Sequence, residues 1–167
     1  MTNHPNWRLP EVPTFTLESP DFQEGEPLPD WARADAGNRR PTLRWSGVPD
    51  GTKSFAITLY DPDAPTGSGF WHWAAYDIPG DVTELAGDAE LPAPAKPVKN
   101  EMGRPVFMGA APPPGDGPHR YFFTVSALST DHLQVPDDAT PAVLGFLLRE
   151  HLVGRAQLMG TQETPAS

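Results

Sequence analysis

The sequence contains no cysteine among its 167 residues. Disulfides, thiolate zinc sites, iron–sulfur clusters and cysteine nucleophiles are therefore excluded. No stretch approaches the roughly 18 apolar residues that a membrane-spanning helix needs, and the N-terminus lacks the basic start and apolar core of a signal peptide. We therefore expect a cytoplasmic protein without stable membrane insertion.

Basic residues are also scarce, with 12 Lys and Arg against 22 Asp and Glu and a net charge of −10. The longest basic run is Arg39-Arg40. Such a surface repels nucleic acid and anionic membranes, so we expect no nucleic-acid partner. The 22 prolines and 15 glycines leave little room for long helices, which argues against a helical bundle.

Segments with an apolar period of two predict most of the secondary structure. The N-terminal residues 1–11 are expected to form an irregular arm, and the proline-rich segment 92–118 an extended loop, because proline cannot supply the backbone donor of a central strand or helix. Strands are expected at residues 12–18, 43–45, 54–60, 71–78 and 121–128.

The C-terminal segment predicts one amphipathic helix that covers the sheet. Thr140 is a suitable N-cap and Pro141 a suitable first helical residue. Leucines recur at helical spacing as far as Leu158, with an interruption near Gly154 and a stop at Gly160. Strands followed by a helix indicate a mostly β fold in one domain over residues 1–167.

The first candidate cluster follows the strand at 54–60 and reads Asp61-Pro62-Asp63-Ala64-Pro65. Asp61 continues the alternation of the strand and is expected to point into a cavity. Asp63 is expected to accept hydrogen bonds from the backbone of the turn. The alternative is that both carboxylates only form the turn, since Asp is common there for local reasons.

The second cluster is Phe70-Trp71-His72-Trp73. We expect His72 to lie on one face of its strand and the two tryptophans on the other. If this strand pairs with the preceding one, His72 can meet Asp61, and a carboxylate nearby favours the charged imidazolium. The alternative is a core histidine with satisfied hydrogen bonds.

The third cluster is the run of small residues and prolines from Gly109 that ends at His119-Arg120-Tyr121. Small residues let the backbone approach a ligand closely. His119 and Tyr121 share strand parity and are expected to face one cavity. Arg120 faces the other way and is expected to pair with an acidic residue. The alternative is a rigid loop that leads into a strand.

Motifs for other chemistries are missing from the sequence. It contains no G-x-S-x-G, no P-loop and no G-x-G-x-x-G. The five histidines occur neither as H-x-H nor as H-E-x-x-H. We therefore assign no catalytic residue, no metal ligand and no cofactor.

Taken in order, the three clusters resemble the phosphatidylethanolamine-binding protein family, and most of all its bacterial Raf-kinase-inhibitor-like branch. The resemblance runs from about Leu17 to Thr161. It is supported by the stretches FQEGEPLP (22–29), LRWSGV (43–48) and ATPAVLGF (139–146). It implies a large antiparallel sheet packed on a smaller sheet, with a C-terminal helix.

The resemblance also implies a shallow pocket for small anions such as phosphate or a phospholipid head group. In it, two histidines and a tyrosine would donate hydrogen bonds, and Asp61 would orient a histidine and support its charge. The segments Ala110-Ala111 and Asn38-Arg39-Arg40-Pro41 depart from the family pattern beside this pocket. The implied ligand-binding residues are Asp61, Phe70, His72, Ala111, Pro112, Pro113, His119 and Tyr121.

Three functions follow as hypotheses. The first is a binding protein that holds a small anionic ligand without turnover. The second is a small hydrolase in which Asp61 and His119 act as an acid–base pair. The third, implied by the resemblance, is a regulator of a kinase or protease, whose protein partner the residues do not specify. The bacterial branch also implies a homodimer.

Overall fold

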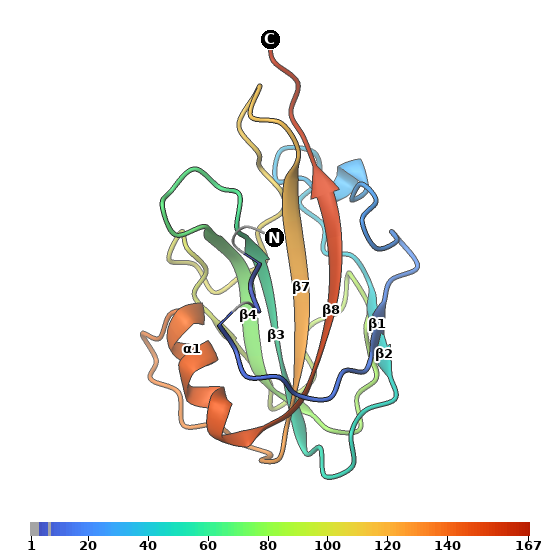
Figure 1. The fold of residues 1–167 in the computed structure, drawn as a ribbon, viewed down its shortest axis with the longest axis vertical. Helices are drawn as coiled ribbons and strands as arrows, with labels where there is room; N and C mark the ends of the chain where they lie inside the picture. The colour runs from blue at the N-terminus through green and yellow to red at the C-terminus, as the bar shows by residue number, and fades with distance from the viewer. Residues whose placement is uncertain (1–3, 7) are drawn as a thin grey trace.

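A computed structural model describes residues 4–6 and 8–167 of the chain, and residues 1–3 and 7 of the predicted arm lie outside this part. Two antiparallel sheets pack against each other (Figure 1). The smaller sheet has the order β1-β2-β5, with bounds β1 (Thr16–Glu18), β2 (Leu43–Ser46) and β5 (Glu84–Leu85). The mostly β fold with a large and a small sheet is therefore confirmed.

The larger sheet has the order β6-β4-β3-β7-β8, so β3 and β7 occupy its centre. The alternating apolar residues of these two strands explain their position, because they are buried from end to end of each strand. The proline-rich segment supplies only the short edge strand β6, as expected for a strand that contains proline. The bounds are β3 (Ser54–Asp61), β4 (Phe70–Pro79), β6 (Lys96–Val98), β7 (His119–Leu128) and β8 (Leu152–Gln162).

The main core lies between the two sheets. Phe55, Ile57 and Leu59 on β3 project into it and are at most 1% exposed, with Trp45 of β2 packed edge-on against Phe55. A second cluster covers the opposite face of the large sheet, which we call the outer face. There Leu144 of the helix α1 (Pro141–Leu147) packs among buried residues such as Ala56 and Ala74.

The predicted strands at 43–45, 54–60, 71–78 and 121–128 correspond to β2, β3, β4 and β7. The strand predicted at 12–18 is shorter, since β1 begins at Thr16 and Thr14 makes only an isolated bridge to Arg155. The prolines that flank this segment limit its pairing, because each lacks a backbone donor.

The long C-terminal helix was predicted wrongly. Thr140 caps α1 as expected, accepting a hydrogen bond from the backbone N of Val143. The helix ends at Leu147, a 3₁₀ turn η2 (Leu148–His151) follows, and the remaining residues form β8. Alternate residues of β8 are buried, from Gly154 to Gln162, so its period is two.

The two tryptophans were expected to lie opposite His72, which is correct for Trp71 and wrong for Trp73. β4 carries one extra residue at this point, since Leu59 pairs with Trp73 whereas Tyr60 pairs with Trp71. Such a bulge interrupts the regular alternation of side chains between the two faces of the sheet. As a result Trp73 lies in the main core and Trp71 stacks on Tyr60 at the outer face.

The described part of the N-terminal arm crosses the outer face of the large sheet (Figure 1). Asn6 and Gln157 of β8 exchange two hydrogen bonds of 3.1 and 3.0 Å, and the ring of His4 packs edge-on against Phe122. The arm is therefore tied to the sheet at several points. Among the described residues, no helix has the length and apolarity needed to cross a bilayer.

Candidate functional site

A small cavity of about 160 Å³ opens where β3 ends and β4 and β7 begin. These three strands are neighbours in an antiparallel sheet, so the end of β3 and the starts of β4 and β7 meet at one edge. Six of the predicted ligand-binding residues line the cavity: Asp61, Phe70, His72, Ala111, Pro113 and His119. Ala64, Pro65, Thr66 and Met108 line it as well and were not predicted.

Asp61 and His119 form a buried pair at the centre of the site. The Nδ1 atom of His119 lies 2.7 Å from Oδ2 of Asp61, and both side chains are at most 3% exposed. The second carboxylate oxygen of Asp61 accepts a hydrogen bond from the backbone N of Asp63 at 2.7 Å. The turn therefore fixes the carboxylate, and the carboxylate orients the imidazole.

The other ring nitrogen of His119 contacts a second carboxylate. Its Nε2 atom lies 2.5 Å from Oδ2 of Asp116, whose side chain is 38% exposed. Burial alone would lower the pKa of His119, but the hydrogen bonds and negative charges of Asp61 and Asp116 outweigh it and raise the pKa above its ordinary value. With a carboxylate at each nitrogen, His119 is an imidazolium that donates twice.

His72 has the opposite protonation behaviour. Its Nδ1 atom lies 3.0 Å from the carbonyl oxygen of Met108 and therefore carries a proton. Burial lowers the pKa of His72, and the hydrogen bond to Met108 and the more distant charge of Asp61 compensate only in part. The expected meeting of Asp61 with a charged His72 is thus corrected, because His119 takes that place and His72 is neutral with Nε2 as an acceptor.

Tyr121 stands behind both histidines. Its ring lies edge-on to His72 at 5.4 Å and stacked on His119 at 6.5 Å between centroids. The side chain is fully buried, and its hydroxyl makes no hydrogen bond of good geometry among the described residues, although Asp61 and the backbone of Ala111 lie near it. Burial and then the charge of Asp61 raise the pKa of Tyr121, so the hydroxyl keeps its proton and remains a donor.

The proline loop meets the expectation only in part. Ala111 and Pro113 line the cavity, whereas Pro112 is buried and does not. Asn38, in the segment that departs from the family pattern, has a positive φ of 56° and accepts a hydrogen bond of 2.6 Å from the backbone N of Gly109. Asparagine tolerates this backbone conformation better than most residues, so this segment supports the loop that carries the pocket wall.

Arg120 and Asp63 connect the turn after β3 to the start of β7. The carboxylate of Asp63 accepts hydrogen bonds from the backbone N, Nε and Nη2 of Arg120 at 2.8 to 2.9 Å. The predicted acidic partner of Arg120 is therefore confirmed. The expected role of Asp63 is corrected, because Asp61 and not Asp63 accepts from the turn backbone.

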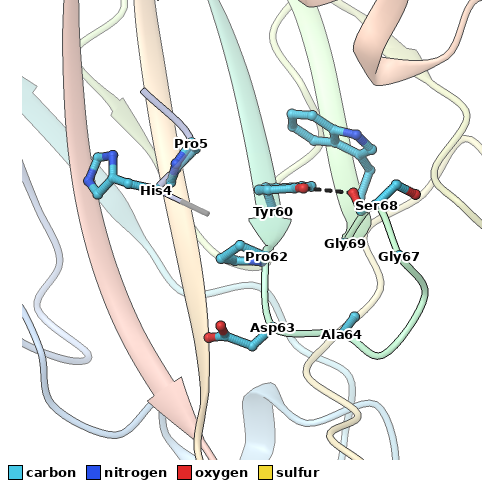
Figure 2. Close-up of a pocket in the computed structure, with 10 residues that line it drawn as sticks. His4, Pro5, Tyr60, Pro62, Asp63, Ala64, Gly67, Ser68 and Gly69 are labelled. Atoms are coloured by element: carbon cyan, nitrogen blue, oxygen red, sulfur yellow. Dashed lines mark hydrogen bonds between the residues drawn. The ribbon is translucent and has the colours of Figure 1, made fainter. Parts of the chain in front are cut away.

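The same turn borders a larger hollow of about 490 Å³ on the outer face, shown in Figure 2. Here the hydroxyl of Tyr60 donates to the carbonyl oxygen of Ser68 at 2.7 Å. Among the described residues, the one carboxylate that lines the hollow is that of Asp63, which is already paired with Arg120. We therefore take the small cavity and not this hollow as the candidate site.

A family model described as phosphatidylethanolamine-binding protein matches residues 18–163. The chain belongs to the phosphatidylethanolamine-binding protein family. It is 41% identical over 164 residues to the UPF0098 protein YbcL of Escherichia coli, which covers 92% of this chain and 90% of YbcL. The UPF0098 protein YbhB of the same organism is 39% identical over 152 residues, covering 85% of this chain and 96% of YbhB.

Solved structures agree with the assignment to this family. The crystal structure of YbcL has a TM-score of 0.85 and covers 89% of this chain and 98% of its own. The family homologue CT736 from Chlamydia trachomatis has a TM-score of 0.82 at 30% identity, covering 90% of this chain and 98% of its own. The sequence relatives and the solved structures thus agree on the fold that the resemblance implied.

Asp116 is the residue of this family member whose role sequence reasoning missed. It lies between Gly115 and Gly117, both with positive φ near 80°, and was taken as part of a loop. Its spacing of three residues from His119 was the available signal. Among the described residues, no group of three metal-ligating side chains is close enough to hold a cation.

Proposed function

We propose that the small cavity binds the phosphoryl group of phosphate or of a phosphomonoester such as phosphoethanolamine, and releases it unchanged. The observation that carries this proposal is the hydroxyl of Tyr121, which is buried without a partner beside an imidazolium. A buried hydroxyl without a hydrogen bond costs about 1–3 kcal/mol. A ligand oxygen at the cavity would supply the missing acceptor.

The pattern of donors and acceptors favours a phosphoryl group that carries a proton. His119 lines the cavity and is a donor, and Tyr121, which does not line the cavity, is a second donor packed directly behind the two histidines. His72 is neutral with its proton on Nδ1, so Nε2 requires a donor. A monoprotonated phosphate can accept hydrogen bonds through its anionic oxygens and can donate one through its hydroxyl. Sulfate carries no proton at neutral pH and can only accept.

Entry of an anion requires that Asp116 leaves His119. The carboxylate of Asp116 occupies the Nε2 position that a ligand oxygen would take. Asp116 lies in an exposed loop between two glycines with positive φ, a backbone conformation that glycine adopts at low cost. Withdrawal of the carboxylate therefore requires either a change of the Asp116 side chain or a movement of this loop, in which Gly115 N donates to the carbonyl oxygen of Thr164 at 2.9 Å.

The size of the cavity supports a head group as ligand. At about 160 Å³ it is smaller than the roughly 300 Å³ at which pockets for drug-sized molecules begin. A phosphoryl group with a short ethanolamine substituent can enter, but an acyl chain cannot. Bulk transport of lipid is therefore not part of this proposal.

Nuclear magnetic resonance of the histidine rings tests this function. Phosphate, phosphoethanolamine and sulfate are titrated separately at pH 6.5, and the ring signals of His72 and His119 should shift with phosphate and phosphoethanolamine but much less with sulfate. The ring of His132 is an internal control, since it is bound to Asp77 elsewhere. If the rings of His72 and His119 respond to none of the three anions, the proposal is wrong.

A second candidate is hydrolysis of a phosphomonoester, favoured by the buried pair of Asp61 and His119 at 2.7 Å. This arrangement can orient an imidazole for proton transfer. We rank it second because Asp116 holds Nε2, and the hydroxyl of Thr66, which lines the cavity, is bonded to Gly69. The test is turnover of p-nitrophenyl phosphate, which should be absent or equal in wild type and His119→Gln if the protein only binds.

A further inference from the structure

A second cavity, of about 410 Å³, lies on the outer face of the large sheet and is separate from the candidate site. We call it the outer groove. One wall is the N-terminal arm at residues 5, 6 and 8–10, and the opposite wall is α1 with η2 (Figure 1). Its floor is the outward side of the central strands and carries the polar side chains of Thr58, Thr124, Ser126 and Gln157.

The charge of the outer groove differs from that of the whole chain. Its lining includes three arginines, Arg8, Arg149 and Arg155, and no carboxylate, although acidic residues outnumber basic ones 22 to 12 in the sequence. Among the described residues that line the groove, all the charged side chains are therefore basic, and Arg155 is the one that lies on its floor, on β8. A locally positive region on a protein of net negative charge attracts anionic ligands to that region.

Arg155 lies at the centre of this field. It is partly buried on β8, and its Nη1 donates to the carbonyl oxygen of Pro10 at 3.3 Å. Burial alone lowers its pKa, because no carboxylate of the described residues lies near enough to oppose the effect. A guanidinium has five N–H donors, and the hydrogen bond to Pro10 uses one of those of Arg155, which lines the groove.

The walls of the groove also carry apolar side chains, one of which, Phe146, has the guanidinium of Arg149 at 4.1 Å from its ring centroid. Leu9 on the arm is 41% exposed and Phe146 on α1 is 62% exposed, which places them among the most exposed large apolar side chains of the described residues. Leu148 and Leu152 line the side near the helix. The volume lies within the range of small-molecule pockets, about 300–1,000 Å³, and exposed apolar surface gathered around a cavity marks a binding site.

We propose that the outer groove binds the anion of a medium-chain alkyl carboxylate, with its head group on Arg155 and its chain along Leu9 and Phe146. The carboxylate takes hydrogen bonds from the guanidinium, whose planar donors match two carboxylate oxygens. The alkyl chain removes the exposed apolar side chains from water. Threonine and serine hydroxyls on the floor supply further donors to the head group.

Calorimetry with decanoate, below its micelle concentration and at pH 8, tests this proposal. We expect saturable binding at one site, with affinity that rises about threefold for each methylene from hexanoate to decanoate. Arg155→Gln should weaken decanoate binding about tenfold, as expected for loss of a charge-assisted bond. Decanol, which matches the chain but lacks the charge, should bind wild type more weakly than decanoate.

Matched controls separate this site from the others. Arg44→Gln removes the same charge from an exposed ion pair with Glu84 on the small sheet and should leave decanoate binding unchanged. Tyr121→Phe alters the small cavity and should also leave it unchanged, so failure of the phosphate proposal and failure of this one are distinguishable. Thermal unfolding checks that each variant is folded.

Three results would overturn the proposal. These are the absence of saturable decanoate binding, equal affinity for decanol and decanoate, and unchanged affinity in folded Arg155→Gln. If that variant does not fold, amide shifts in the wild type decide: decanoate should move the signals of Thr124 and Ser126, which lie on the floor of the groove. Shifts confined to other parts of the chain would contradict the assignment.

Discussion

Replacing Asp116 by asparagine should strengthen phosphate binding. In the unliganded protein the Asp116 carboxylate lies 2.5 Å from Nε2 of His119 and competes with any anion for that donor. Asparagine has nearly the same shape but no charge, so it competes less and also removes a repulsion between the loop and the ligand. If the Asp116 carboxylate instead assisted phosphate binding by positioning His119, Asp116→Asn would bind phosphate more weakly.

The size of the effect follows from the contact. A hydrogen bond between charged partners contributes about 1.5–3 kcal/mol when it is shielded from water. Because the Asp116 side chain is 38% exposed, solvent screening reduces this to about 1 kcal/mol. A ligand that must displace the carboxylate gains this amount in the variant, which corresponds to about a fivefold lower Kd.

The assay is calorimetric titration of phosphate into wild type and Asp116→Asn. It is run at pH 6, because loss of Asp116 removes one of the two carboxylates that raise the pKa of His119, and a lower pH favours the protonated ring in both proteins. Asp131→Asn is the control, since it removes the same charge from an exposed residue away from the cavity. Equal or weaker phosphate binding in Asp116→Asn, with the control unchanged, would refute the displacement.

Three further outcomes are expected. Tyr121→Phe removes the buried hydroxyl that lacks a partner, so urea unfolding should show stability unchanged or higher by about 1 kcal/mol, whereas phosphate affinity falls; a large loss of stability would show that the hydroxyl is already satisfied. The raised pKa of His119 contributes stability that is complete below its unfolded value of about 6.5 and is lost as pH rises through the folded value, so the pH profile of unfolding should flatten in His119→Gln. Gly109→Ala would place a Cβ 2.2 Å from the carbonyl oxygen of Ala32 and should destabilise the protein by about 2 kcal/mol, while Gly145→Ala, with open space around it, should not; equal melting temperatures of the two would contradict this reasoning.

Much of the fold could be predicted because its central strands carry their pattern in large apolar residues. Large apolar residues alternate along the whole of β3 and β7 in the sequence. Asp61 and His119 continue this alternation at the end of β3 and the start of β7, which lie at the same edge of the sheet. These two strands are antiparallel neighbours, and their register, which pairs Tyr60 with Phe122, brings Asp61 opposite Tyr121, with His119 two residues away on the same face of β7. The pair at the centre of the site is therefore a consequence of strand parity.

β8 could not be predicted in the same way because its buried face is built from small residues. A Cβ on Gly154 would lie 2.7 Å from Pro49, and one on Gly160 would lie 2.5 Å from Leu28. The segments packed on this strand come so close that large apolar side chains do not fit. What remains visible in the sequence is a set of leucines whose spacing matches a helix by coincidence.

The protonation of the site could not be predicted either, since it depends on contacts between distant segments. Sequence parity suggested a charged His72 beside Asp61, but the carbonyl oxygen of Met108 fixes the proton on Nδ1 and burial keeps the ring neutral. The turn composition around Asp116 concealed its contact with His119. Both contacts come from the proline-rich segment, whose path has no periodic signal.

The bulge at His72 accounts for the position of functional groups on both faces of the large sheet. Without the extra residue, strand parity would turn His72 toward the outer face whenever Trp73 enters the core. With it, Trp73 stays in the core and His72 lines the small cavity, while Trp71 pairs with Tyr60 and lines the outer groove. One inserted residue therefore gives adjacent side chains to two separate cavities. A shift of this register would therefore change the lining of both cavities.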